Sequence, residues 1–170
     1  MSIGLLILRL AVGLTLAAHG GQKLFGWFEG GGISATAAGM EYLGFRPGRV
    51  AAVLSGLAEF GGGLFLAVGF LTPFAAAAVV GNMLVAMAAV HWKNGFFVTK
   101  NGIEYTLVLA AAAAGLAFTG PGALSTDAVL GIAWPAAAAV AALVLGILTA
   151  AVQLSTRRAA PVAVAQEPGQ

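Results

Sequence analysis

Glu59 stands near the middle of an apolar run that extends over residues 50–70. A run of about 20 apolar residues can cross the hydrocarbon core of a bilayer as one helix. A carboxylate near the bilayer centre costs about 2.5–3.5 kcal/mol on insertion scales, so Glu59 must be protonated, paired or directed at a polar cavity. Its face of the helix otherwise carries small residues, which would let a second helix or a ligand approach closely.

Two further polar residues, Arg9 and Asn82, interrupt apolar runs at similar depths. At about 1.5 Å per residue, Arg9 lies about 9 Å, Asn82 about 14 Å and Glu59 about 16 Å below one membrane boundary. Because an arginine side chain can span the difference, we predict that Arg9 pairs with Glu59 and that Asn82 is a hydrogen-bonding third member. This buried polar centre could line a ligand cavity or be purely architectural. In the alternative, Arg9 extends toward water and Asn82 joins two helices.

A second polar layer is expected nearer the opposite boundary, formed by His19, Gln22, Lys23, His91, Glu104 and Tyr105. Two histidines on different helices could ligate haem or a metal ion, but no further ligand pattern accompanies them, so we predict no metal site. Hydrogen bonds to Glu104, to a quinone or to an anionic head group are favoured over ligation of haem or a metal, and simple capping at the interface stays open as the alternative. Asn82 and His91 are nine positions apart, about 180° on a straight helix, so they are not expected to face one cavity.

The composition indicates that membrane helices hold these residues. The 170 residues are 60% hydrophobic and 8% charged, whereas soluble domains contain about 25% charged residues. The net charge of +2 comes from scattered basic residues that form no stripe, which excludes nucleic-acid binding. The sequence contains no cysteine, so a redox role would require a bound cofactor or a partner. No catalytic triad, pair of catalytic carboxylates or HExxH motif is recognisable.

Five apolar runs are predicted to span the membrane, at residues 3–22, 50–70, 73–92, 104–118 and 129–154. An amphipathic helix is expected over residues 34–43, and Ser125 or Thr126 can cap the helix that follows them. With five spans, one side of the membrane receives seven basic residues: Lys23, Arg46, Arg49, Lys93, Lys100, Arg157 and Arg158. The positive-inside rule assigns that side to the cytoplasm, which puts the N-terminus outside and the C-terminus inside.

Four segments, in this order and spacing, resemble the DoxX family: HGGQKLFG at residues 19–26, EFGGGL with GFLT at 59–64 and 69–72, GIEY at 102–105, and GPGALSTD at 120–127. The resemblance implies an all-α, polytopic membrane helix bundle with a four-helix core over residues 1–127. A fifth transmembrane helix over residues 128–154 and a disordered cytoplasmic tail over residues 155–170 are expected beyond it. The positions that the resemblance marks as important in the family, without a catalytic role, are His19, Lys23, Glu59 and Glu104.

The resemblance also implies a bacterial inner-membrane protein associated with oxidoreductase systems in redox, thiol or sulfur metabolism. Relatives include a subunit of a thiosulfate:quinone oxidoreductase and a membrane component that forms a complex with superoxide dismutase and a sulfurtransferase. We therefore expect a non-catalytic subunit, rather than an enzyme acting alone. It would anchor a soluble oxidoreductase or sulfurtransferase at the cytoplasmic face and could contact quinone.

Two other classes of function stay open. Arg9, Glu59 and Asn82 could form the central site of a transporter for a small metabolite or a lipid. Alternatively, the polar pairs could only fix the register of the helices in a structural membrane protein. Each of these classes is compatible with a homo-oligomer.

Overall fold

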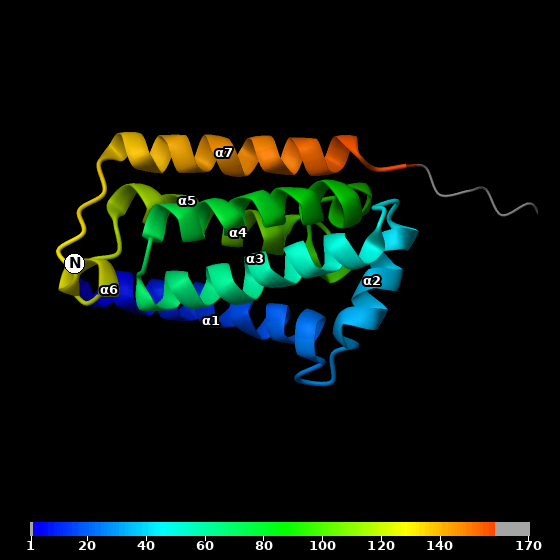
Figure 1. Cartoon of the computed structure of the whole chain (residues 1–170), viewed down its shortest axis with the longest axis horizontal. Coiled ribbons are helices and arrows are strands. Elements are labelled where there is room, and N and C mark those ends of the chain that lie inside the picture. The colour runs from blue at the N-terminus through cyan, green and yellow to red at the C-terminus, as the bar shows by residue number, and fades with distance from the viewer. Residues whose placement is uncertain (1, 159–170) are drawn as a thin grey trace, which may run out of the picture.

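Five long helices lie side by side in the computed structural model, which describes residues 2–158 (Figure 1). They are α1 (Ser2–Phe25), α3 (Gly48–Val68), α4 (Thr72–Ala86), α5 (Glu104–Thr119) and α7 (Ala136–Ser155). α4 continues into a π-helix, η1 (Met87–His91), and a 3₁₀ turn, η2 (Trp92–Asn94). The connections contain α2 (Gly32–Tyr42), a second 3₁₀ turn, η3 (Val98–Lys100), and α6 (Thr126–Val129). The described residues contain no strand, so the predicted all-α class is confirmed.

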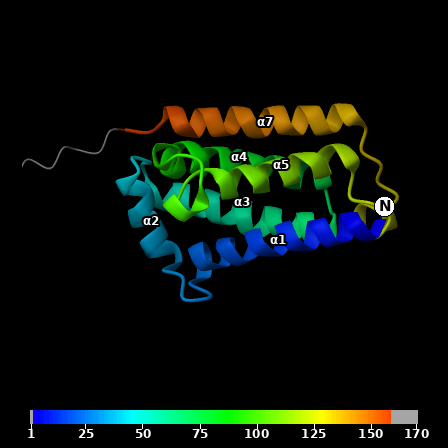
Figure 2. The ribbon, with the colours of Figure 1, turned by 180° about the vertical axis from the view of Figure 1, so that it is seen from behind.

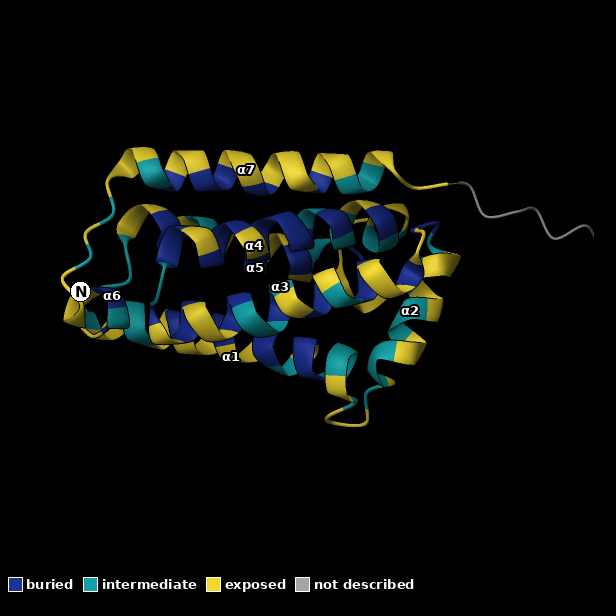
Figure 3. Cartoon of the chain, in the orientation of Figure 1, coloured by how far each residue is buried: buried dark blue, intermediate teal, exposed yellow. Residues whose placement is uncertain are grey.

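The long helices have the character of membrane spans. Four helical segments are long and apolar enough to cross a bilayer, namely Ser2–Phe25, Gly48–Val68, Thr72–Asn94 and Ala136–Ser155. α5 is also apolar but has 16 residues, about 24 Å at 1.5 Å per residue. The outward faces of the bundle are exposed (Figure 3) and carry large apolar side chains such as Ile7, Leu57 and Leu145. The chain is therefore a multi-pass membrane protein whose outer surface contacts lipid.

Glycines let the helix backbones approach closely at two places. A Cβ added to Gly13 on α1 would lie 2.5 Å from the carbonyl oxygen of Gly63 on α3. Likewise, a Cβ added to Gly81 on α4 would lie 2.7 Å from the carbonyl oxygen of Gly146 on α7. Small residues at such contacts are typical of helix packing in membranes. α7 is thus packed against α4. α5 packs on α4 as well, and in the view from behind it lies in front of α4 and below α7 (Figure 2).

The ends of several elements differ from the expectation. α1 continues to Phe25 instead of ending at residue 22. The last spanning helix begins at Ala136 instead of residue 129, because Pro135 with its extended backbone occupies the N-cap. Ser125 is a cap as predicted, since its side chain accepts a backbone hydrogen bond, but the helix that it caps is α6. The helix predicted over residues 34–43 is α2.

The described chain begins and ends at opposite ends of the bundle, as five crossings require (Figure 1). At the end where α2 lies, the backbone N–H of Arg158 donates to the carbonyl oxygen of Gly44 at 2.9 Å. This bond ties the end of α7 to the connection between α2 and α3. The predicted disordered tail, residues 155–170, is therefore ordered at its beginning, and residues 159–170 lie outside the described part of the chain.

Candidate ligand-binding site

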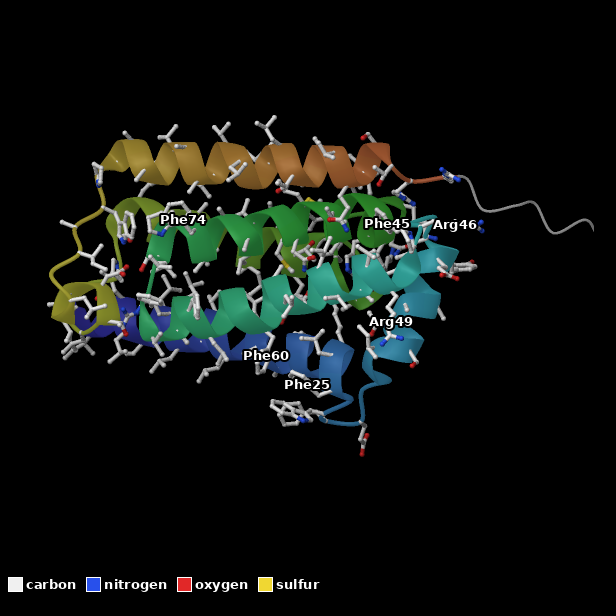
Figure 4. The ribbon with its side chains drawn as sticks, viewed as in Figure 1. Phe25, Phe45, Arg46, Arg49, Phe60 and Phe74 are labelled. Atoms are coloured by element: carbon white, nitrogen blue, oxygen red, sulfur yellow. The ribbon has the colours of Figure 1, made fainter. Side chains whose placement is uncertain are left out.

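A cavity of about 330 Å³ lies among α1, α2, α3, α4, η1, α5 and α7. Its wall is mainly apolar, and the polar residues that line it are His19, Lys23, Ser55, Glu59, Asn82, His91, Tyr105, Thr106 and Gln153. An apolar wall with a few convergent polar groups is typical of small-molecule sites, whose volumes are about 300–1,000 Å³. Phe45 lines the cavity and lies near the end of α7, whereas Phe74 marks the opposite end of the bundle (Figure 4).

Glu59 is the buried acid of this cavity, with 4% of its surface exposed. Its Oε1 atom accepts hydrogen bonds from Lys23 Nζ at 2.6 Å and from Asn82 Nδ2 at 3.0 Å. Lys23 also donates to Ser55 Oγ at 3.0 Å. The other carboxylate oxygen, Oε2, is buried and has no hydrogen-bond partner within residues 2–158. Because Glu59 lines the cavity, this oxygen is the candidate acceptor for a hydrogen-bond donor of a bound molecule.

The packing of α1 on α3 brings Lys23 to Glu59. In the last turn of α1, Leu24 lies against Gly56 on α3, one turn before Glu59. Because Ser55 and Gly56 are small, the lysine side chain has room to lie along α3 and reach the carboxylate. The predicted hydrogen bond between Asn82 and Glu59 is confirmed, and the cation that neutralises Glu59 is Lys23.

The predicted pair of Arg9 and Glu59 does not form, and that prediction was wrong. Arg9 lies against Gly69, the C-cap residue of α3. A Cβ added to Gly69 would contact the guanidinium group of Arg9. Glu59 precedes Gly69 by ten residues, or about 15 Å along the helix. The charges of Arg9 and Glu59 are therefore too far apart to form an ion pair. The depth estimate failed because it measured each residue from the end of its own apolar run. The contacts between α1 and α3 set the actual register.

Arg9 belongs to a different polar cluster, around Asp127. Its Nη2 donates to the carbonyl oxygen of Leu124 at 2.5 Å, and its guanidinium group lies against Gly69, whose carbonyl oxygen accepts a hydrogen bond from Asp127 N at 2.9 Å. Asp127 is fully buried and accepts four hydrogen bonds of 2.8–3.1 Å, from Leu71 N, Thr72 N, Thr72 Oγ1 and Trp134 Nε1. Arg9 Nε and Nη1 find no partner in the described chain, but contact with Gly69 fills the space beside Nη1. This cluster joins α1, the α3–α4 turn and the connection from α6 to α7.

Two residues of the predicted second polar layer meet at the cavity. His19 Nε2 lies 3.2 Å from the hydroxyl of Tyr105, so the pair connects α1 with α5. The tautomer of the imidazole decides which of the two donates. Both residues line the cavity, so either could also form a hydrogen bond with an oxygen of a ligand.

Two other residues of that layer, Gln22 and Glu104, do not line the cavity. Gln22 Nε2 donates to the carbonyl oxygen of Phe28 at 3.3 Å, and Glu104 Oε2 accepts from the backbone N–H of Val98 at 2.8 Å. Both side chains hold connections between helices. The predicted layer is therefore divided, with His19, Lys23, His91 and Tyr105 at the cavity and these two outside it.

His91 lines the same cavity as Asn82, against the expectation from a straight helix. The reason is the π-helix η1, Met87–His91. Hydrogen bonds from residue i to i+5 turn the chain less per residue than those of an α-helix, which rotates His91 toward the side of Asn82. His91 Nδ1 lies 2.9 Å from the carbonyl oxygen of Asn101, and because a carbonyl only accepts, this nitrogen carries the proton.

Gln153 on α7 is a lining residue that sequence reasoning missed. Its Nε2 atom is buried and has no hydrogen-bond partner among the described residues. The available signal was a single amide within the last apolar run, since an isolated polar group in a spanning helix often marks a site. That run lies beyond the segments that resemble the family, so the resemblance gives no indication of Gln153.

The lining suits hydrogen bonding to a mostly apolar molecule. Glu59 offers an acceptor, and Lys23, Tyr105 and Gln153 carry donor groups. No group of three His, Cys, Asp or Glu side chains within residues 2–158 could hold a metal ion. The arrangement fits a molecule with an apolar body and one or two oxygen functions.

Comparison with models of known protein families finds a match over the first half of the chain. A family model described as DoxX matches residues 4–92, which is 89 of the 170 residues. The matched part contains Lys23, Glu59, Asn82 and His91, whereas Tyr105 and Gln153 lie after it. No curated protein and no solved structure matches the chain.

Proposed function

The chain belongs to the DoxX family of membrane proteins, and we propose that it is a membrane subunit of an oxidoreductase system that binds a quinone or quinol in the Glu59 cavity. The observation that carries this proposal is Glu59, which lines a cavity of about 330 Å³ and whose buried Oε2 lacks a partner in the described chain. Because the chain has no cysteine, thiol chemistry in such a system would reside in a partner.

The polar groups of the cavity are compatible with both redox forms of a quinone. Glu59 Oε2 can accept a hydrogen bond from a quinol hydroxyl. Tyr105 and Gln153 can donate to a quinone carbonyl. Leu109 and Met83 belong to the apolar wall, which suits the faces of a ring. In this proposal the chain orients and holds the molecule, and the partner performs the reaction.

The partner would bind at the end of the bundle where α2 lies. We place this end on the cytoplasmic side of a bacterial inner membrane. The helix ends and connections there carry the seven basic residues that the positive-inside rule assigns to the cytoplasm. The connection between η2 and η3 exposes Phe96 and Phe97, with 50% and 61% of their surfaces accessible. Exposed aromatic side chains of this kind suit contact with a soluble protein. We also propose that residues 1–127 form the family core and that α7 is an addition to it.

Mass spectrometry of the protein purified gently from its native membrane tests the proposal. We expect bound quinone on the wild type and on the control variant Glu29→Gln, whose glutamate is exposed, and its loss from Glu59→Gln. We expect Phe96→Ala with Phe97→Ala to lose the soluble partner while keeping the quinone. A wild type without quinone, or Glu59→Gln with undiminished quinone, would contradict the proposal.

A transporter with a central site at Arg9, Glu59 and Asn82 has less support. Such a site needs the three side chains together, whereas Arg9 belongs to the Asp127 cluster near the opposite end of the bundle. Only Glu59 and Asn82 of that set share a cavity.

A further inference from the structure

A second hollow, the groove, lies between α3, α4 and α7 and has a volume of about 650 Å³. Its lining is mainly small or apolar and includes Leu54, Ala58, Ala78, Leu145, Leu148 and Val152. More than half of the surface is exposed on Leu54, Leu145, Leu148 and Val152, at 56–63%. The groove therefore opens on the outer surface of the bundle, where α3 and α7 flank α4 (Figure 3). In a membrane this surface faces lipid chains.

The groove and the Glu59 cavity share two lining residues, Asn82 and Gln153. Asn82 is held by its hydrogen bond to Glu59 at 3.0 Å. Gln153 Nε2, by contrast, is buried without a partner in the part of the chain described. The two hollows thus adjoin at Asn82 and Gln153, and no hydrogen bond within residues 2–158 holds the amide nitrogen of Gln153 in place.

We propose that the ligand of the cavity is an amphipathic molecule that enters from the bilayer through the groove. Its oxygen-bearing head lies at Glu59 and Gln153, and its hydrocarbon tail lies in the groove between α3 and α7. This inference rests on the proposed function for the head and adds the tail site, the access route and a role for α7. A molecule without a tail would leave the apolar, lipid-facing groove unused.

The polar groups specify the head more closely. Glu59 Oε2 needs a donor, whereas Gln153 Nε2 needs an acceptor, and both atoms are buried. A head that carries a hydroxyl together with a carbonyl or ether oxygen satisfies both atoms. The apolar lining of the groove, in turn, selects a saturated or isoprenoid chain over a polar one.

Equilibrium binding in lipid nanodiscs tests the tail site. The two probes are the ubiquinol ring without a tail and the same ring with a decyl chain. Filling the groove by Ala58→Phe or Ala78→Phe should lower the preference for the decyl probe by about tenfold, because the tail loses its apolar contacts. Ala111→Phe, on an exposed alanine of α5 away from the groove, is the matched control. Because both probes partition into the same lipid in every sample, a change in the ratio of their affinities measures the contribution of the groove to binding of the tail.

Gln153→Leu tests the head contact. Leucine keeps most of the volume but removes the amide, so both probes should bind about three- to tenfold more weakly and the preference for the tail should persist. Gln22→Leu, which removes an amide outside the cavity, should leave both affinities unchanged.

The outcomes separate the two proposals. If both probes bind and the groove variants keep the full preference for the decyl chain, access through the groove is wrong and the proposed function stands. If neither probe binds the wild type, the proposed function is wrong, and the proposed tail site is then wrong as well. Binding of the tail-less probe by Ala58→Phe and Ala78→Phe shows that these variants are folded.

Discussion

Asp127 and Glu59 are both buried carboxylates, but the protein surrounds them differently. Asp127 accepts hydrogen bonds from four donors, and both of its oxygens are satisfied. Trp134, one of those donors, also packs on Phe74 (labelled in Figure 4) with ring centroids 5.4 Å apart, and Asp127 itself is fully buried. Glu59, which lines a cavity, directs one oxygen at two donors, while the other oxygen has none within residues 2–158.

The difference indicates that the two carboxylates serve different purposes. Buried polar groups are nearly always satisfied, and a fully satisfied network makes a structure rigid. An unsatisfied oxygen beside an open cavity is available to a ligand instead. Arg9 shows that the lack of a partner is not a sufficient criterion, because its unpartnered Nη1 is packed against Gly69. A candidate site requires both an unsatisfied atom and space beside it.

Replacing Asp127 should have the largest effect on stability. Asp127→Ala leaves four donors without an acceptor, so we expect a loss of about 3–5 kcal/mol in the free energy of unfolding. Unfolding in detergent micelles measures this loss, with Glu29→Ala as the exposed control. Asp127→Asn should lose less and, where folded, should keep the ligand affinity of the wild type. An Asp127→Ala protein as stable as the wild type would remove the contrast between the two carboxylates.

Removing the cation beside Glu59 should have an intermediate effect. Lys23→Met leaves the carboxylate uncompensated, but the lysine side chain is 27% exposed, so we expect a loss of about 2 kcal/mol instead of the value for a fully buried pair. Adding Glu59→Gln should restore most of the lost stability, because the uncompensated charge is gone. The same unfolding measurement on both single variants and the double variant checks the coupling. Losses that simply add would show that Lys23 does not stabilise Glu59.

Neutralising Glu59 alone should cost little stability and most of the ligand binding. Glu59→Gln keeps the shape of the side chain and an acceptor for Asn82, so we expect a loss of about 1 kcal/mol. The new amide nitrogen cannot accept a hydrogen bond from a quinol hydroxyl, and affinity for the quinol should fall at least about tenfold. Unfolding and nanodisc binding on one preparation measure both effects. If the variant loses as much stability as Asp127→Ala and keeps its affinity, Glu59 is architectural.

The smallest effect should come from Tyr105. Tyr105→Phe removes the 3.2 Å hydrogen bond to His19, and because Tyr105 is 39% exposed we expect a stability loss of about 0.5 kcal/mol. Affinity for the quinone form should fall about threefold if the hydroxyl donates to the ligand. Tyr42→Phe, at a residue that is 80% exposed and outside the cavity, serves as the control. Equal affinities of the two variants would exclude Tyr105 from the candidate site.

The amino-acid sequence alone determined the class of the protein and the residues whose burial needs compensation. Apolar runs long enough to cross the hydrocarbon core predict spanning helices. This inference needs no neighbouring segment, because each segment separately determines the cost of placing its backbone and its charges in lipid. The same argument identified Glu59 and Asn82 as groups that need partners, and the structure joins them at 3.0 Å. It also predicted the short helix α2 and the cap at Ser125.

The tertiary structure alone decided which polar groups meet. Helix register follows from close contacts such as those of Gly13 with Gly63, and these place Lys23 beside Glu59 and Arg9 near Asp127. The π-helix η1 rotated His91 into the cavity, and the packing of α7 on α4 brought Gln153 there. A hydropathy pattern reports how deeply a residue lies and what its burial costs. The direction in which that residue points depends on how the helices pack together. The sequence of a single segment does not determine that packing.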